Sequence, residues 1–397
     1  MVRIPCASFS NMEGTASENE RNDIVKTATM TFKNLAGTHY EVGQTLGRWV
    51  RSRPDLLQRA ILPPSAYPED KLRAIKALLD RHCIGVNEEI QGFADTLDIS
   101  SDQAMYYAAT YVERGCSAMA ALPSRTANGH ALMARNYDFT DEIEELCFVY
   151  TDIDGAFRHI GSLLNLFGRC DGMNEHGLAV CITSNGIPVG NFEGGRKAGV
   201  TGFMFWAVVR SILEQCATVD EAVAWAMDAP IGFNINLMLA DGDGRIGLLQ
   251  CMDGHKGYEA LENDPTNRAR KADHLAVTNH VVLPDVKPFE TELLDNSVKR
   301  LAAIERFFDT HATVSVDDLK TLLSTPYPEG LCCHYYPAFF GTLRSMVFDT
   351  ATRSIEMTCG SPRANAWHRF AVEPLDEQDF SIGLPCEDAN EEFFRIL

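Results

Sequence analysis

The apolar pattern of the chain changes character at Gly115-Cys116, and this change limits the folds that are open to it. Before this point, apolar residues recur at helical spacing, as in Leu72, Ile75 and Leu78. After it, short strand-like runs alternate with turn signals. We therefore expect a mostly helical N-terminal segment that ends at residue 115 and a strand-rich segment that begins at residue 116.

The order of the expected elements predicts an α+β fold. Strands are followed by two helices, then by strands, helices and strands, which is typical of two antiparallel sheets stacked between helical layers. The expected strands are 29–35, 147–152, 157–160, 177–183, 234–240, 245–251, 275–282 and a final hairpin of 343–348 and 354–358. The expected helices after residue 116 are 202–216, 219–227, 296–308 and 316–323. The divisions are a polar, flexible tail over 1–28, a helical segment over 29–115 and the sheet-containing segment over 116–397.

The charge and the cysteines narrow the classes of function. The 397 residues carry a net charge of −20, which disfavours nucleic acids and acidic lipid surfaces as partners. No apolar run approaches the roughly 18 residues of a membrane helix, and the N-terminus lacks the apolar core of a secretory signal. The 12 cysteines are scattered, several of them inside apolar runs, which is typical of reduced thiols in a cytoplasmic protein. Formation of a homo-oligomer stays open.

No cofactor or metal is expected. The one tight group of potential ligands is Cys332-Cys333-His334, and adjacent residues of a strand point to opposite faces. The phosphate-binding loop, the zinc motif H-E-x-x-H and the serine-hydrolase motif G-x-S-x-G are all absent from the sequence.

The stretch from Cys116 to Asp138 contains a candidate nucleophilic site. An Asn128-Gly129 pair, typical of a tight hairpin turn, separates two apolar runs. Antiparallel pairing would bring Cys116, near the start of the first run, beside Arg135 and Asp138 at the end of the second. A thiol, a cation and a carboxylate can form a nucleophilic site. The alternative is a buried, inert thiol with an ordinary surface ion pair.

Polar residues interrupt or end three other apolar strands. Asn236 lies inside one, Asn279 ends another, and Ser184-Asn185 ends a third. A buried amide needs hydrogen-bond partners, so each is a candidate for binding substrate or an oxyanion. Taken singly, each could instead satisfy the backbone of a turn.

The chain resembles the N-terminal-nucleophile hydrolases, specifically the group that contains isopenicillin-N acyltransferase, with choloylglycine hydrolases as more distant relatives. Taken in order and spacing, the matching segments cover about residues 32–375. They are the glycine-spaced stretch 32–47, Arg114-Gly115-Cys116, Asn128-Gly129 with 135–138, the stretch 172–180 (GMNEHGLAV), Thr278-Asn279-His280, Ser297 with Arg300, and 342–360.

The resemblance implies an αββα sandwich and an inactive precursor. Cleavage between Gly115 and Cys116 would leave Cys116 as a new N-terminus, with fragment 1–115 still bound to 116–397. The free α-amine titrates near neutral pH and can serve as the base for the thiol. Arg135 would stabilise the thiolate, and Asp138 would orient the amine.

The resemblance also assigns the oxyanion site. Asn279 would donate to the oxyanion, which can be worth about 2.7–4 kcal/mol. A backbone N–H near Ser184-Asn185 would be a second donor, and Arg300 a further member of the site.

Three features depart from the family pattern. The family's acyltransferase has Gln where Arg135 stands, whereas bile-salt hydrolases have Arg. The spacing from Cys116 to Asp138 is longer, and Cys251 replaces a serine that the family uses in processing. These departures predict slower or differently tuned processing.

The leading hypothesis is a self-processing amidase that cleaves a small linear amide. An acyltransferase with an amine acceptor is the first alternative, although no Lys/Arg-rich groove for a coenzyme A phosphate is evident. An unprocessed, non-enzymatic binding module is the second.

Overall fold

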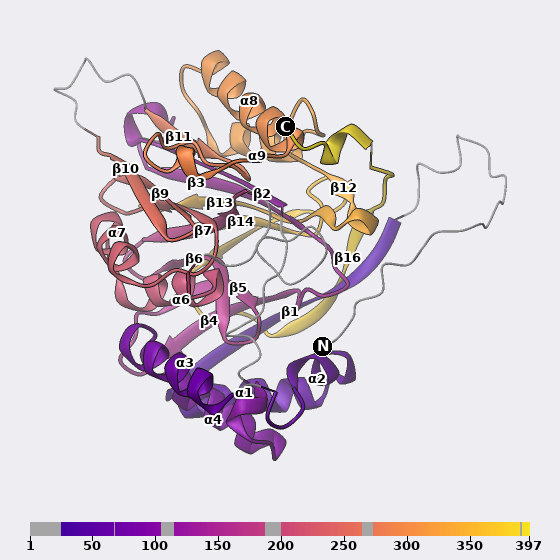
Figure 1. The fold of residues 1–397 in the computed structure, drawn as a ribbon. Coiled ribbons are helices and arrows are strands. Elements are labelled where there is room, and N and C mark those ends of the chain that lie inside the picture. The colour runs from indigo at the N-terminus through magenta and orange to yellow at the C-terminus, as the bar shows by residue number, and fades with distance from the viewer. Residues whose placement is uncertain (1–24, 67, 105–114, 187–199, 264–272, 390) are drawn as a thin grey trace.

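Two sheets packed face to face form the centre of the protein, with helices on their outer faces (Figure 1). The computed structural model describes residues 25–66, 68–104, 115–186, 200–263, 273–389 and 391–397. The four layers match the expected αββα sandwich of the N-terminal-nucleophile hydrolases.

The first sheet, sheet A, contains nine strands in the described residues. Its strand pairs are antiparallel except for β1 and β4, which run parallel. In spatial order the strands are β10 (His255–Leu261), β9 (Ile246–Met252), β8 (Ile235–Ala240), β7 (Ala179–Ser184), β6 (Gly168–Asn174), β5 (His159–Leu164), β4 (Cys147–Ile153), β1 (Val25–Gly37) and β16 (Gln378–Pro385).

The second sheet, sheet B, is antiparallel throughout its described strands. In spatial order they are β11 (His274–Val277), β2 (Gly115–Ala121), β3 (Leu132–Phe139), β13 (Phe340–Asp349), β14 (Ser354–Cys359) and β15 (Trp367–Ala371), and β12 (His334–Tyr335) pairs with β13. β2 and β3 therefore form the predicted antiparallel pair.

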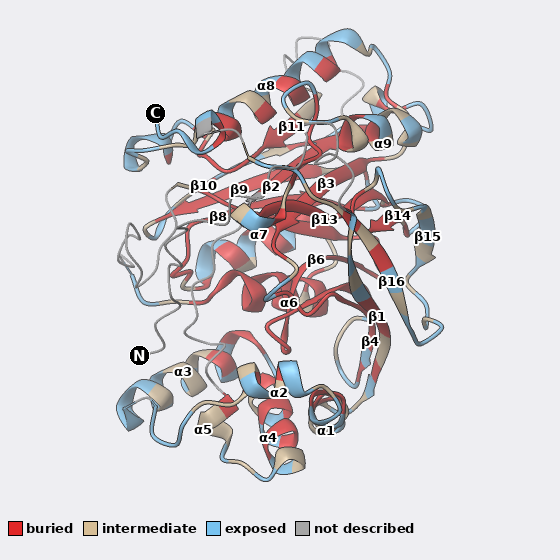
Figure 2. Cartoon of the chain, turned by 90° about the vertical axis from the view of Figure 1, so that its right-hand side faces the viewer, coloured by how far each residue is buried: buried red, intermediate tan, exposed pale blue. Residues whose placement is uncertain are grey.

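Helices cover both outer faces, and Figure 2 shows the buried strands between more exposed helices. The helices are α1 (His39–Arg51), α2 (Pro54–Ala60), α3 (Glu69–His82), α4 (Val86–Leu97), α5 (Ser101–Ala104), α6 (Phe205–Gln215), α7 (Val219–Asp228), α8 (Asp295–Thr310) and α9 (Val316–Ser324). Short 3-10 turns are η3 (Pro123–Arg125), η4 (Lys287–Phe289), η5 (Tyr336–Ala338) and η6 (Glu391–Phe394). α6 and α7 pack on sheet A, and α8 and α9 pack on sheet B.

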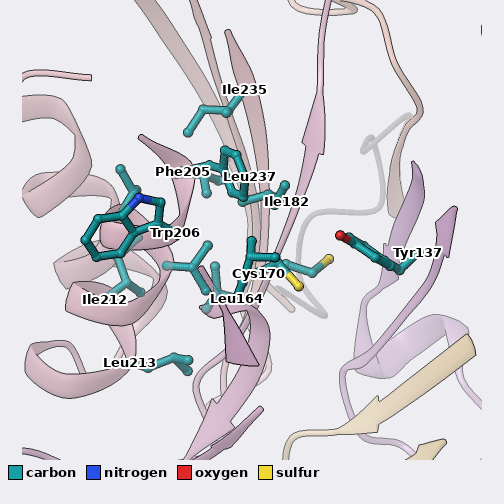
Figure 3. Close-up of a cluster of buried hydrophobic side chains, with 14 of the residues drawn as sticks. Tyr137, Leu164, Cys170, Ile182, Phe205, Trp206, Ile212, Leu213, Ile235 and Leu237 are labelled. Atoms are coloured by element: carbon teal, nitrogen blue, oxygen red, sulfur yellow. The ribbon is translucent and has the colours of Figure 1, made fainter. Parts of the chain in front are cut away.

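Each strand divides its side chains between two cores because successive residues point to opposite faces. On β2, Cys116, Ala118 and Ala120 lie in the large core between the sheets, whereas Met119 and Ala121 pack under α8 and α9. Figure 3 shows buried side chains on both faces of sheet A: Trp206 and Leu213 of α6 lie on one side, and Tyr137 of sheet B lies on the other.

The spaced glycines of the N-terminal segment allow α1 and α4 to touch. A side chain at Gly43 would place its Cβ 1.9 Å from the Glu89 carbonyl oxygen, and one at Gly92 would lie 2.1 Å from that of Tyr40. The helix pair therefore packs backbone to backbone, which accounts for two glycines in helices where this residue is unfavourable.

Several elements differ from expectation. Asn128-Gly129 does not form a two-residue hairpin turn, because β2 ends at Ala121 and β3 begins at Leu132; the connection includes η3. β1 begins at Val25, so residues 25–28 belong to a strand rather than to the expected tail. The chain does not end in the β13–β14 hairpin, since β15 and β16 follow it. Residues 1–24 of the tail and 105–114 of the expected helical segment lie outside the described residues.

Candidate active site

The register of β2 and β3 places Cys116 opposite Tyr137, and Gly115 opposite Asp138. Arg135 lies two residues from Tyr137 on the same face of the sheet, so a long side chain can reach the thiol diagonally. Asp138 lies on the opposite face, toward α8. The two residues therefore flank the Gly115–Cys116 peptide from opposite sides of sheet B.

The thiol of Cys116 contacts the Arg135 guanidinium in the core between the sheets. Arg135 Nη2 donates to Cys116 Sγ at 3.3 Å, and both side chains are fully buried. Arg135 Nη1 donates to the Cys170 carbonyl at 2.9 Å and lies 3.1 Å from Asp171 Oδ2. Burial alone would lower the pKa of Arg135, but Asp171 and the nearby thiols outweigh it and raise this pKa. The guanidinium thus stays charged beside the sulfur.

Asn279 and Arg300 hold the backbone of Cys116. Cys116 N donates to Asn279 Oδ1 at 3.1 Å, and Arg300 Nη1 donates to the Cys116 carbonyl at 2.6 Å. Arg300 Nη2 also donates to Asn279 Oδ1 at 2.7 Å. Because two N–H donors meet Oδ1, the orientation of the Asn279 amide is fixed. Two of the predicted residues from distant segments therefore meet at Cys116.

The amide nitrogen of Asn279 points toward the end of β7. It donates to the Ser184 carbonyl at 2.9 Å and lies 3.3 Å from Ser184 Oγ. Ser297 Oγ accepts from the Asn279 backbone N–H at 2.7 Å. Sheet A, β11 and α8 together orient the Asn279 side chain within bonding distance of the Cys116 backbone.

Asp138 is a buried carboxyl group with one partner among the described residues. Thr342 Oγ1 donates to Asp138 Oδ1 at 2.7 Å, whereas Oδ2 has no hydrogen bond there. Burial raises the pKa of Asp138 to about 6, although Arg300, Thr342 and Arg135 each act to lower it. A buried oxygen without a donor marks a place where a cationic donor would be stabilised.

Asn236 lies behind the site rather than in contact with Cys116. Its Nδ2 donates to Thr183 Oγ1 at 2.8 Å and to the Thr278 carbonyl at 3.1 Å. Its Oδ1 accepts from Asn185 Nδ2 at 2.8 Å and from Gln250 Nε2 at 2.6 Å. With these four bonds, Asn236 joins β7 and β8 to the strand end that bears Asn279.

Asn185 and Cys251 belong to the same hydrogen-bonded group as Asn236, behind Cys116. Asn185 Nδ2 donates to the Cys251 carbonyl at 3.2 Å, while Asn185 Oδ1 has no hydrogen bond among the described residues. The Cys251 thiol lies 3.9 Å from the Ile231 carbonyl, and burial raises its pKa to about 11. Cys251 thus packs as a protonated, buried thiol.

Four residues of the site were not predicted from the sequence: Asp171, Ser297 in its bonding role, Thr342 and Arg344. Asp171 lies in β6, which is buried throughout, and Arg344 lies in β13, which is buried in all but its last residue. Buried charges require partners, so this pattern is a signal that could have identified them.

No metal centre emerges in the described parts of the chain, where no three His, Cys, Asp or Glu side chains form a group able to hold an ion. Cys332 Sγ and His334 Nε2 lie 3.4 Å apart, but His334 is also bonded to Ser361 and Glu387. None of the described helices is long and apolar enough to span a membrane.

Comparison with known proteins places these residues in a family. Residues 124–364 match the family model of acyl-coenzyme A:6-aminopenicillanic acid acyl-transferase, a segment that contains Arg135, Asp138, Asn279 and Arg300 and begins after Cys116. A search of curated proteins found no significant match.

Solved structures match this chain at low identity and with TM-scores below 0.5. They include an N-acylethanolamine-hydrolysing acid amidase ortholog from Caenorhabditis elegans, with 15% identity over 59% of this chain and 93% of that one and a TM-score of 0.41. Penicillin V acylase from Agrobacterium tumefaciens matches with 15% identity over 71% of this chain and 90% of that one, with a TM-score of 0.37. A variant of conjugated bile acid hydrolase from Clostridium perfringens matches with 12% identity over 69% of this chain and 99% of that one, with a TM-score of 0.40. Since the matched family segment spans more than half of the sequence, the chain belongs to the acyl-coenzyme A:6-aminopenicillanic acid acyl-transferase family.

Proposed function

We propose that this protein is a self-processing amidase that cleaves a small N-acyl amide through an acyl-enzyme on Cys116. The observation that carries the proposal is the convergence of three side chains on this one residue. Arg135 contacts its thiol, Asn279 its backbone nitrogen and Arg300 its carbonyl oxygen. An inert core cysteine has no need of two buried arginines.

Processing begins with attack of Cys116 Sγ on the carbonyl carbon of Gly115. The S–C bond forms, the Gly115–Cys116 C–N bond breaks, and the released nitrogen takes the thiol proton. Water then opens the thioester to give a Gly115 carboxylate and a free Cys116 α-amine and thiol. The cleavage thus creates the nucleophile and its base on one residue, because an α-amine titrates at about 7.7–8.0.

The same residues then serve turnover. Arg135 stabilises the thiolate, which is the nucleophilic form of cysteine. Asp138 Oδ2, which has no hydrogen bond among the described residues, receives the new ammonium group. Asn279 Nδ2 redirects one of its two hydrogens from the Ser184 carbonyl to the oxyanion. The acyl group leaves the sulfur when water attacks the thioester.

Intact-mass measurement and denaturing electrophoresis test the proposal. The wild-type chain should give two fragments that divide between Gly115 and Cys116, and Cys116→Ala should give one uncut chain. Cys181→Ala is the matched control, since Cys181 is another fully buried thiol near Arg135, and this variant should cut like wild type. A wild-type chain that stays whole and releases no amine from N-acyl amino acids, β-alanyl amides or penicillins would refute the amidase and favour a binding module.

Acyl transfer is the second candidate, and the description of the matched family favours it. Water and an amine compete for the same thioester, so the two activities differ only in the acceptor. Product analysis with a fixed acyl donor and rising amine concentration separates them. A transferase forms N-acylated amine at the expense of free acid, whereas a strict amidase forms free acid at every amine concentration.

A further inference from the structure

Arg135 does not face Cys116 unaided, because a carboxylate from the opposite sheet holds it. Asp171 of β6 places Oδ2 3.1 Å from Arg135 Nη1 and 3.4 Å from Arg344 Nε. Its other oxygen, Oδ1, accepts from the Ser162 backbone N–H at 3.1 Å. All of these side chains are buried, so Asp171 is a charged bridge between the two sheets directly behind the nucleophile.

The ring of Tyr137 packs against both Arg135 and Arg344. The Arg135 guanidinium carbon lies 5.1 Å from the centre of the Tyr137 ring, and that of Arg344 lies 3.9 Å from it. Figure 3 shows this ring extending from sheet B toward Cys170 on the facing sheet. Glu144 completes the group, with Oε1 3.4 Å from Arg344 and Oε2 accepting from Tyr137 Oη at 2.8 Å. Two arginines and two carboxylates thus form one buried cluster of balanced charge.

The partners of Asp171 determine its protonation. Burial alone would raise the pKa of its carboxyl group, but Arg135 and Arg344 outweigh burial and hold this pKa below its usual value. The group therefore remains a carboxylate and can fix the Arg135 guanidinium. Arg135 has few other anchors in the described chain: Nη1 also meets the Cys170 carbonyl, and Nε has no hydrogen bond.

We propose that Asp171 is a positioning residue for the Cys116 thiolate: it holds the Arg135 guanidinium at the sulfur, with Arg344 keeping the cluster neutral. This deepens the proposed function, on which it rests. Without the Asp171 anchor, Arg135 is free to turn toward Glu144 or to swing away from the thiol, and the thiolate loses its cation. Carboxylates that orient the ligands of a metal ion typically change activity by about 10- to 100-fold when removed, and we expect an effect of the same size for a carboxylate that orients Arg135.

Charge and position predict opposite shifts, which makes the proposal testable. Asp171→Asn keeps the shape and the acceptor for Ser162 but removes a negative charge from the cluster. If Arg135 stayed in place, the cluster would become more positive and the thiolate would form at lower pH. If Asp171 positions Arg135, the thiolate loses contact with Arg135 and forms at higher pH.

The measurement is the ultraviolet absorbance of the Cys116 thiolate as a function of pH. Each variant is compared with the same variant carrying Cys116→Ala, so that the difference reports this thiol alone. We expect Asp171→Asn to move the titration midpoint up by about one pH unit, which is tenfold less thiolate at a given pH. The rate of self-cleavage should fall about 10- to 100-fold.

Two further variants complete the test. Glu144→Gln is the matched control, because Glu144 belongs to the same cluster but contacts Arg344 and Tyr137 rather than Arg135. It removes the same charge with Arg135 still anchored, so its midpoint should stay at or fall below the wild-type value. Asp171→Asn combined with Arg344→Gln restores neutrality and guards against a variant that fails to fold. Positioning predicts that this double variant keeps the raised midpoint.

A midpoint that is unchanged or lowered in Asp171→Asn, or restored to the wild-type value in the double variant, overturns the inference. The titration needs only folded protein, so it gives an answer even if the wild-type chain never cleaves. Failure of self-cleavage in wild type refutes the proposed function, whereas a normal thiolate titration in Asp171→Asn refutes the role of Asp171.

Discussion

One buried arginine, Arg210 of α6, joins the N-terminal helices to the rest of the protein, and its removal should destabilise the fold strongly. Arg210 Nη1 and Nη2 contact Glu89 of α4 at 2.9 and 2.6 Å, and Arg210 Nε donates to Glu214 at 2.9 Å. All three side chains are almost fully buried. Arg210→Met would leave two carboxylates without this cation, whereas Glu89→Gln would leave Arg210 paired with Glu214.

The asymmetry sets the expected magnitudes. Removing one partner of a buried ion pair typically raises the folded-state free energy by about 3–5 kcal/mol. We assign Glu89→Gln to the lower end, about 3 kcal/mol, and Arg210→Met to the upper end, about 5 kcal/mol. Arg158→Met is a control of the same chemistry: its guanidinium contacts Glu175 at 2.6 Å but is half exposed, so water screens the pair and the expected loss of stability is much smaller than for Arg210→Met.

Urea unfolding in the Cys116→Ala background measures these losses on an uncut chain. Burial alone would raise the pKa of Glu89, but Arg210 outweighs burial and holds this pKa below its usual value. The stabilisation is therefore present above the unfolded-state pKa and is lost as the pH falls through the folded-state pKa. The difference in unfolding free energy between Glu89→Gln and its parent should therefore become smaller at acidic pH. Equal effects of Arg210→Met and Arg158→Met, or a larger effect of Glu89→Gln than of Arg210→Met, would refute this reasoning.

Two other predictions concern the site itself. In the uncut Cys116→Ala chain, the raised pKa of Asp138 means that its contribution to stability is fully present below its unfolded-state value and is lost as the pH rises to about 6. The unfolding free energy of Asp138→Asn minus that of its parent should thus increase by up to about 3 kcal/mol between pH 4 and 6 and remain constant at higher pH. A difference that does not change with pH would contradict this prediction. Asn236→Ala breaks four buried hydrogen bonds and should lower stability by about 1–3 kcal/mol in urea unfolding, while leaving the thiolate titration of Cys116 unchanged; a shifted titration would place Asn236 in the catalytic site.

The layered fold was predictable because most strands and helices follow simple apolar periods. α6 and α7 were located within a few residues, and Thr218 caps α7 by accepting from the Glu221 N–H. β6 was missed because Arg169 and Asp171 interrupt its apolar pattern; the structure buries both charges with partners from other strands. Tertiary pairing here overrides local pattern.

The sequence predicted that certain residues come together at Cys116, but it could not predict their geometry. Sequence order and family resemblance brought Cys116, Arg135, Asn279 and Arg300 together. They could not show that the Asn279 oxygen faces the Cys116 N–H, or that Arg135 depends on Asp171, because both facts arise from the facing of two sheets. The expected hairpin failed at Asn128-Gly129 because the connection between β2 and β3 contains its own 3-10 turn.

The position of β1 within sheet A has a consequence for the time at which the chain becomes complete during synthesis. β1 lies between β4 and β16 and is the one described strand that pairs with β16, so Thr31 bonds Asp379 across 348 residues of sequence. A ribosome adding about 5–20 residues per second leaves β1 without this partner until almost the whole chain has emerged. One edge of β1 therefore stays unpaired during most of synthesis. A chain truncated before β16 would keep this long strand edge unpaired and prone to aggregation.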